Sequence, residues 1–318
     1  MRVHVVATGG TIAMAGALAA PAHAGEELVA ALPGVEEIAD VSVEQVANVP
    51  GVELSPQLAA EALERAERAV AAGARGAVIV QGTDTIEETA QLGDLLWRHE
   101  EPVVVTGAMR PASTPSADGP SNLLDAIRVA VSPQARRAGA LVSFDGLVHA
   151  GDAAVKSHSW RPAAFSSQVP VGRVREGVVE LRTRPERRPP IGTLQAALDG
   201  GFERRVPIVA AAAGMDGAPL AIEGAEAIVL IALGAGHVPK AMLPAVDEAL
   251  ERGLPVVACA RPHEGGTLRR TYGYEGSESD LERRGVILAG DASPWKARIR
   301  VLAALALRLD PRELFHAA

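Results

Sequence analysis

The chain has 318 residues, of which 48% are hydrophobic and 22% are charged. A chain this long and apolar can bury a full core, which excludes a mainly disordered protein and suggests one large domain or two ordinary ones. Its 31 Lys and Arg against 39 Asp and Glu give a formal net charge of −8. Because no basic block is present to neutralise phosphates, we expect no nucleic-acid partner.

The single cysteine, Cys259, excludes an intramolecular disulfide and any zinc site built from several cysteines. It lies in the apolar run 255–260, which favours a buried side chain. No apolar run approaches the roughly 20 residues of a membrane span, so no membrane partner is expected. Residues 1–24 partly resemble a secretory signal, but Thr8-Gly9-Gly10-Thr11 interrupts their apolar stretch. We therefore expect a cytoplasmic protein, with export as the alternative.

Short apolar runs alternate with segments of helical periodicity, which is the βαβ rhythm of a parallel sheet covered by helices. Apolar residues have helical spacing over 58–70 and 92–96, and a further helix is expected near 122–131. Strands are predicted over residues 3–7, 77–81, 103–106, 139–143, 206–212, 227–232, 255–260 and 286–289.

This rhythm stops over residues 182–192, where prolines and repeated charges can continue neither a helix nor a strand. We therefore predict an α/β protein with a larger N-terminal domain over 1–182, a linker over 183–205 and a smaller C-terminal domain over 206–318. Each domain is expected to hold a mainly parallel sheet covered by helices. Ligands of such sheets bind beyond the carboxyl ends of the strands, so polar residues there are candidates for a functional site.

The segment Thr8-Gly9-Gly10-Thr11 directly follows the first predicted strand. Its two glycines let the backbone turn tightly and approach a ligand, with Thr11 presented beside backbone N–H groups. A hydroxyl in this position is a candidate nucleophile. The alternative is that Thr11 caps a helix, as threonine often does.

A second polar segment, Gly82-Thr83-Asp84, follows the strand predicted over 77–81. Thr85 with Glu88 has the spacing of a helix capping box, which is a purely structural role. Because one residue suffices as the cap, the hydroxyl and carboxylate just ahead of it are candidates for binding a ligand.

Lys156 is a candidate cation for the same site. An exposed lysine is the ordinary alternative. If Lys156 lies beside Thr83 and Asp84, its proton can be shared with the threonine hydroxyl. His149 and His158 show no helix-face ligand spacing, so we expect no metal.

Taken together, these segments resemble the bacterial L-asparaginase and glutaminase-asparaginase family. The resemblance is carried in order by Thr8-Gly9-Gly10-Thr11-Ile12-Ala13, Gly82-Thr83-Asp84-Thr85, Gly107-Ala108-Met109-Arg110-Pro111, Ser116-Ala117-Asp118-Gly119-Pro120 and Asp152-x-x-x-Lys156 with Phe165. It covers nearly the whole chain. It implies amide hydrolysis with release of ammonia, without metal or organic cofactor. It also implies a homotetramer, a dimer of dimers, with active sites between the N-terminal domain of one subunit and the C-terminal domain of a neighbour.

The resemblance also implies roles for individual residues. Thr11 is the nucleophile that forms an acyl-enzyme, while Lys156 and Asp84 polarise Thr83 and a water for deacylation. Backbone N–H groups near Thr11 and Thr83 stabilise the developing oxyanion. The implied substrate-binding residues are Gly10, Gly82, Asp84 at the substrate's α-ammonium group and Ala108 at its side-chain amide.

The sequence departs from the family in three places. The lid, Met14 to Gly25, contains no tyrosine, although the family usually has one there that assists the nucleophile. The stretch 48–53 lacks the Ser-Gln pair that commonly binds the substrate's α-carboxylate. Gly234-Ala235-Gly236-His237 stands where the family has Gly-Asn-Gly-Asn. These changes do not affect the residues of the hydrolytic core, but they alter the residues expected to bind the substrate.

The two tyrosines of the chain, Tyr272 and Tyr274, both lie in the glycine-rich segment 265–275. In the family this region approaches a neighbour's active site. We predict that Tyr274 or Tyr272 supplies the missing phenol and that Glu275 meets the substrate's amine. The alternative is that both are ordinary interface tyrosines.

The main expectation is therefore an asparaginase that converts L-asparagine to L-aspartate. The lost carboxylate-binding pair and the small-residue lid suggest a second reading, a related amidase that acts on a larger amide. A third is a non-catalytic amino-acid-binding protein that has lost the activation of Thr11.

Overall fold

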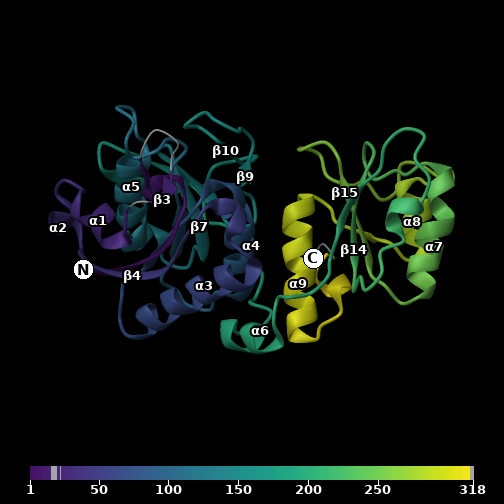
Figure 1. The fold of residues 1–318 in the computed structure, drawn as a ribbon, viewed down its shortest axis with the longest axis horizontal. Coiled ribbons are helices and arrows are strands. Elements are labelled where there is room, and N and C mark those ends of the chain that lie inside the picture. Colours follow the sequence, from purple (N-terminus) through teal and green to yellow (C-terminus); the bar gives the residue numbers. More distant parts are fainter. Residues whose placement is uncertain (16–19, 22, 316–318) are drawn as a thin grey trace. The chain divides into compact units, whose positions relative to one another are not determined.

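The computed structural model describes residues 1–15, 20–21 and 23–315. The chain forms two compact units, Met1–Leu198 and Asp199–Ala318 (Figure 1). The first holds an eight-stranded, mostly parallel sheet and the second a four-stranded parallel sheet, both packed with helices. The predicted α/β fold class is confirmed.

The eight-stranded sheet has the order β12-β11-β8-β7-β6-β5-β1-β4. Its parallel part consists of β1 (Arg2–Gly9), β4 (Asp40–Val49), β5 (Ala77–Val80), β6 (Val103–Thr106) and β7 (Ala140–Phe144). The antiparallel part consists of β8 (Leu147–Ala150), β11 (Gly172–Arg175) and β12 (Val178–Leu181). The sequence predicted β1, β5, β6 and β7 and missed the other four.

Three of the missed strands, β4, β11 and β12, lack the buried apolar run that reveals a central strand. β4 lies at the edge of the sheet, and none of its ten residues is fully buried. Its apolar residues alternate with polar ones such as Ser42 and Glu44, as in a strand with one solvated face. β11 and β12 form a hairpin whose turn residues, Glu176 and Gly177, have φ of 52° and 77°. An edge hairpin of this kind is hard to predict without a strong turn signal.

Helices cover both faces of the large sheet. They are α1 (Gly25–Ala30), α2 (Val35–Ile38), α3 (Pro56–Ala71), α4 (Ile86–Leu96) and α5 (Gly119–Val131). The α3 helix begins where Ser55 accepts a hydrogen bond from the N–H of Leu58, with proline at the first helical position. The α3 and α4 helices pack on one face, and α1 and α5 pack on the other around Val3 and Val5. The helices predicted at 58–70, 92–96 and 122–131 are thus present.

The second unit is a smaller version of the same plan. Its sheet has the order β13 (Ile208–Ala210), β14 (Ile228–Ala232), β15 (Val256–Ala260) and β16 (Ile287–Leu288), and all four strands were predicted. Its helices are α7 (Leu243–Glu251), α8 (Glu278–Arg284) and α9 (Pro294–Leu307). In Figure 1, α9 lies on one side of β14 and β15, and α7 and α8 lie on the other.

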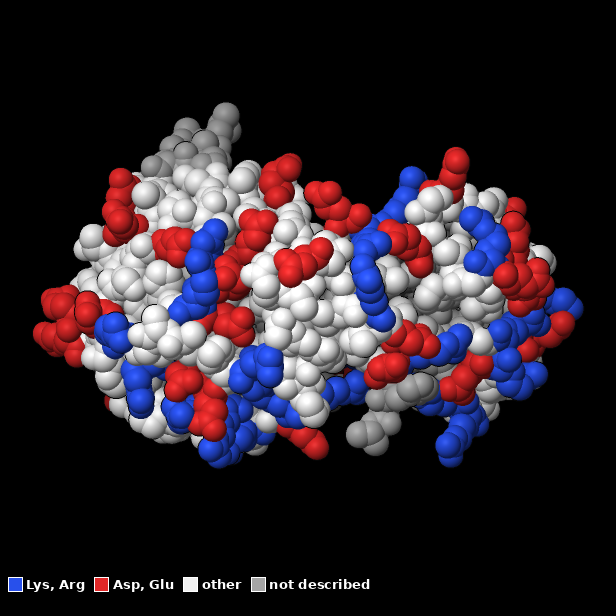
Figure 2. All heavy atoms as spheres, turned by 90° about the horizontal axis from the view of Figure 1, so that it is seen from below, with Lys and Arg blue, Asp and Glu red and all other residues white. Residues whose placement is uncertain are grey.

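Three smaller features complete the described structure. β2 (Met14–Ala15) pairs with β3 (Ala20–Pro21), and β9 (Val155–Lys156) pairs with β10 (Phe165–Ser166). The predicted linker, 183–205, contains the short helix α6 (Leu194–Gly200). Among the described residues, no helix is both long and apolar enough to cross a membrane. Acidic and basic side chains are intermingled on the face shown in Figure 2.

Cys259 in β15 is fully buried, and this burial raises the pKa of its thiol to about 12. The thiolate is the reactive form, so the native protein should not react with Ellman's reagent at pH 8 over an hour. After unfolding in urea, one thiol per chain should react within minutes. Labelling of the native protein at the unfolded rate would contradict this burial.

Candidate active site

A lysine, a threonine and an aspartate meet beyond the carboxyl end of β5. Thr83 and Asp84 lie in a short 3₁₀ helix, Thr83–Thr85, and Lys156 ends β9. The Nζ of Lys156 donates to Oγ1 of Thr83 at 2.9 Å and to Oδ1 of Asp84 at 2.6 Å. The lysine side chain is 14% exposed and that of Asp84 54% exposed. The cation is therefore largely enclosed, while its carboxylate partner opens to solvent.

Two contacts hold Lys156 in place. β9 pairs with β10 so that Lys156 lies opposite Phe165, whose buried ring packs on Phe144 of β7 with centroids 4.8 Å apart. The backbone N–H of Lys156 donates to Oε1 of Glu87 in the first turn of α4, at 3.4 Å. The sequence singled out Phe165 but missed Glu87. The only sequence signal for Glu87 was its position as an acidic residue shortly after Thr83 and Asp84.

Thr11 lies beyond the carboxyl end of β1, the strand that pairs with β5. It begins a 3₁₀ helix whose N-cap is Gly10, so the alternative role of Thr11 as the cap is wrong. The backbones of Gly10 and Gly82 are in contact, because a Cβ on Gly10 would lie 2.2 Å from the nitrogen of Gly82. Thr11 and Thr83 each follow one of these glycines. The fold thus brings the candidate nucleophile and the Lys156 cluster to one edge of the sheet.

The loop after β6 is the third part of this edge. Asp118 accepts hydrogen bonds from the backbone N–H groups of Met109 and Arg110, at 3.0 and 2.9 Å. Asn122 donates to the carbonyl of Gly107 at 3.0 Å. These bonds fix the backbone around Ala108, whose methyl group is fully buried.

The chain after β4 reaches the same place. Gly51 contacts Gly82, and the hydroxyl of Thr85 donates to the carbonyl of Gly51 at 3.3 Å. Thr85 is the N-cap residue of α4 but makes no capping hydrogen bond, so the predicted capping box with Glu88 is not formed. The threonine hydroxyl instead connects two loops of the site.

The predicted lid is described only in part, because residues 16–19 and 22 lie outside the described residues. β2 and β3 form its antiparallel base. The carbonyl of Met14 accepts a hydrogen bond from the N–H of Ala112 at 3.1 Å, which joins this base to the loop after β6.

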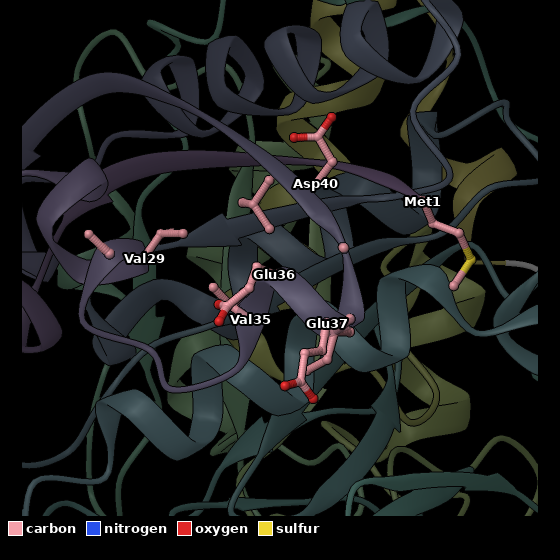
Figure 3. A pocket seen from close by; sticks show the side chains of 10 residues that line it. Met1, Val29, Val35, Glu36, Glu37 and Asp40 are labelled. Carbon is pink, nitrogen blue, oxygen red and sulfur yellow. The ribbon is translucent and has the colours of Figure 1, made fainter.

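An open pocket of about 510 Å³ lies elsewhere in the first unit (Figure 3). It is lined by Met1, Val29, Ala30 and residues 35–41, and it carries the carboxylates of Glu36, Glu37 and Asp40. Met1 precedes β1 and Asp40 begins β4. The pocket is therefore at the amino ends of these strands, opposite the edge that holds Thr11 and Thr83, and is separate from the candidate active site.

The predicted residues of the second unit form a cluster of their own. The Tyr274 hydroxyl lies 3.0 Å from Nδ1 of His237, and Glu275 pairs with Lys240. Tyr272 and Tyr274 are both exposed. The buried Glu278, which contacts the same histidine, was missed by the sequence analysis.

Two family models match the chain and together span most of it. They are "Asparaginase, N-terminal", over residues 2–187, and "Glutaminase/Asparaginase C-terminal domain", over residues 205–317. The chain belongs to the asparaginase family. This confirms the resemblance seen in the sequence and makes the protein an amidohydrolase of this family.

Full-length relatives agree with this assignment. A probable L-asparaginase of Deinococcus radiodurans is 36% identical, covering 99% of this chain and 97% of the relative. A glutaminase-asparaginase of Pseudomonas fluorescens biotype A is 33% identical, covering 98% and 88%. The crystal structure of a probable cytoplasmic L-asparaginase from Campylobacter jejuni superimposes with a TM-score of 0.86 at 30% identity, covering 99% of this chain and 98% of that one.

The Gly10–Gly82 contact predicts a large effect of one methyl group. Gly10→Ala adds a Cβ 2.2 Å from the Gly82 backbone at a φ of 87°. Gly34→Ala is the matched control, because Gly34 has a φ of 70° but open space around its Cβ position. In urea unfolding, G34A should lose about 1–2 kcal/mol and G10A about 2–5 kcal/mol, because only G10A combines the left-handed strain with overlap. Equal losses would contradict the close approach.

Proposed function

We propose that this asparaginase-family enzyme hydrolyses the side-chain amide of L-asparagine to L-aspartate and ammonia through Thr11. The observation that carries the proposal is the contact of Lys156 with both Thr83 and Asp84. Thr11 lies nearby, because it follows Gly10 and the backbone of Gly10 contacts that of Gly82. Two-step acyl transfer needs one hydroxyl as the nucleophile and a second polarised group for the water. The site offers both.

In the first step, the Thr11 hydroxyl oxygen attacks the side-chain carbonyl carbon of the substrate. A C–O bond forms and the C–N bond breaks, and the proton that the Thr11 hydroxyl gives up balances the one that the nitrogen gains before it leaves as ammonia. Backbone N–H groups near Thr11 and Thr83 stabilise the charge that develops on the carbonyl oxygen. The buried Ala108 lines the pocket at the amide end, where its loop is rigidly hydrogen-bonded.

In the second step, a water molecule attacks the ester carbon. The Thr83, Lys156 and Asp84 set takes the proton of the water and returns one to Thr11 as the ester C–O bond breaks. The ammonium of Lys156 donates to Oγ1 of Thr83, which favours negative charge on that oxygen. The half-exposed Asp84 carboxylate also binds the substrate's α-ammonium group.

The test measures ammonia release from L-asparagine, L-glutamine, D-asparagine and L-asparagine with an amidated α-carboxyl group. We expect the highest kcat/KM for L-asparagine. If no amide yields ammonia, yet L-asparagine raises the thermal midpoint, the protein is a binding homologue and the proposal fails.

A second candidate is an amidase for a larger amide, favoured by the loop after β4. Here Gly51, Val52 and Glu53 form a short 3₁₀ helix beside Gly82, and Val52 is exposed. None of these three residues has a hydroxyl or amide side chain for an α-carboxylate, and Glu53 brings a negative charge. Faster hydrolysis of the α-amidated substrate than of L-asparagine would establish this reading.

We further propose a cytoplasmic homotetramer, a dimer of dimers, in which Tyr274 and Glu275 of a neighbouring copy complete the site. Family membership and the exposed tyrosines support the assembly. The name of the Campylobacter structure supports the location, although a Haemophilus influenzae relative is named periplasmic. Light scattering after gel filtration tests the homotetramer, and cell fractionation tests the cytoplasmic location.

A further inference from the structure

A histidine in the second unit connects a buried carboxylate with an exposed phenol. The Nδ1 of His237 lies 3.0 Å from the Tyr274 hydroxyl, and its Nε2 lies 3.2 Å from Oε2 of Glu278. Glu278 is fully buried, the His237 side chain is 19% exposed and Tyr274 is 52% exposed. The three groups form a path from the interior of the unit to its surface.

The surrounding backbone fixes this path. His237 is held by mutual backbone hydrogen bonds with Leu233, at 2.7 and 2.8 Å. Glu278 is the first residue of α8, and its Oε1 accepts from the N–H groups of Thr271 and Tyr272 at 2.8 and 2.7 Å. One carboxylate therefore anchors the tyrosine loop through Oε1 and faces the imidazole ring with Oε2.

The charge of Glu278 decides where the imidazole hydrogen lies. Burial raises the pKa of Glu278, but hydrogen bonds from the backbone of Tyr272 and Thr271, with smaller help from its own N–H and from His237, outweigh burial and leave the pKa below its ordinary value. An ionised carboxylate only accepts hydrogen bonds. Within the described part of the chain, neither the buried Nε2 of His237 nor the buried Oε2 of Glu278 makes a hydrogen bond, so their 3.2 Å approach is an electrostatic contact. The negative charge of Oε2 beside Nε2 favours the hydrogen of a neutral ring on Nε2, which leaves Nδ1 to accept from Tyr274.

We propose that Glu278 and His237 are positioning residues that set the hydrogen-bonding direction of Tyr274. While His237 is neutral, the phenol hydrogen points to Nδ1, and the phenol oxygen presents its lone pairs outward to a hydroxyl or ammonium donor. The identity of the donor rests on the proposed function, in which Tyr274 meets the Thr11 hydroxyl of a neighbouring copy.

Other titratable groups lie close to this path. The ring of Tyr272 stands edge-on to His237 with centroids 4.9 Å apart, and that of Tyr274 at 5.6 Å. Glu275, which follows Tyr274 in the chain, forms an ion pair with Lys240. Glu278 is the carboxylate in contact with the imidazole, and its removal therefore has the largest expected effect on the ring.

The direct test is NMR of the imidazole nitrogens in protein labelled with ¹⁵N-histidine. His237→Asn identifies the His237 signals among those of the eight histidines. At neutral pH the hydrogen should reside on Nε2. Tyr274→Phe should shift the Nδ1 signal and leave the hydrogen on Nε2, whereas Tyr272→Phe, which also keeps its ring, should leave Nδ1 unchanged. A hydrogen on Nδ1 in the unmodified protein, or an unchanged Nδ1 signal in Y274F, overturns the proposal.

Kinetics then separate this proposal from the proposed function. If the protein releases ammonia from L-asparagine, Y274F should lower kcat/KM by about 10²-fold, because the phenol is lost. Activity that depends on Thr11 but is unchanged in Y274F would overturn the link to catalysis while the amidase reading stands. The NMR outcome holds whether or not any amide is hydrolysed.

Glu278→Gln tests the buried end of the path. The amide keeps an oxygen for the N–H groups of Thr271 and Tyr272 but loses the charge, so the His237 ring should show hydrogen on either nitrogen. If E278Q unfolds at a lower temperature, Y274F decides the question, because the exposed Tyr274 can lose its hydroxyl without disturbing the core. A folded E278Q with hydrogen still only on Nε2 would contradict the role of the carboxylate.

Discussion

Valine in place of Thr11 should abolish ammonia release, with a loss in kcat of about 10⁴-fold or more. Valine has nearly the shape of threonine but no hydroxyl, so the acyl-enzyme cannot form. Thr11 is not the cap of the short helix that it begins, so the substitution removes no capping hydrogen bond. The far-UV circular dichroism and thermal midpoint of T11V should therefore match those of the unmodified protein.

Thr85→Val is the matched control for Thr11→Val. Thr85 lies at the same edge of the sheet, and its hydroxyl bonds only to Gly51 and Gln81 among the described residues. T85V should lose about tenfold or less in kcat, because a loosened loop costs less than a missing nucleophile. Suppose that T11V kept one hundredth of the activity of the unmodified protein and that T85V kept no more than T11V. Thr11 would then not be the nucleophile.

Replacing Lys156 by methionine should lower kcat by about 10²- to 10⁴-fold, the range of a lost proton-transfer group. The substitution removes the donor to Thr83 and Asp84 and keeps the apolar stem beside them. Stability should change little, because Asp84 is half-exposed and remains solvated without its partner. Since Lys156 acts on the second step, an acylated Thr11 should accumulate and be visible by mass spectrometry of the quenched protein.

Lys156→Arg distinguishes charge from proton transfer. Arginine restores a cation but does not give up its proton near neutral pH. We expect K156R to remain impaired by at least about 10²-fold, because the site needs a group that can exchange a proton. Full recovery in K156R would show that the positive charge alone suffices.

The buried part of the fold is predictable because its signals are local. An uninterrupted apolar run such as 103–106 is typical of a strand with both faces covered, and β6 has the predicted bounds. β4 escapes this signal because an edge strand needs only one apolar face. The capping box at Thr85 fails for a different reason: its hydroxyl finds partners on neighbouring loops, which no local pattern contains.

The candidate site also contains some residues that local sequence signals reveal and others that only distant contacts reveal. The motifs around Thr11, Thr83 and Asp84 are visible in sequence because glycine and small polar residues collect where parallel strands end. Lys156 is distinguished in the sequence only by its family motif, and the pairing of β9 with β10 brings it within 2.9 Å of Thr83, which lies 73 residues away. Glu278 carried no sequence signal, because its importance comes from burial against His237.

What the sequence by itself determined is the alternation of strands and helices, the order of the polar motifs and the residue types that chemistry requires. These depend on periodicity and backbone preference, which are properties of neighbouring residues. Only the tertiary structure decided that Thr85 ties two loops together, that Lys156 is enclosed beside Asp84, and that one imidazole connects Glu278 with Tyr274. Such contacts depend on how distant segments pack, and packing sets both the distances and the exclusion of water that give these side chains their chemistry.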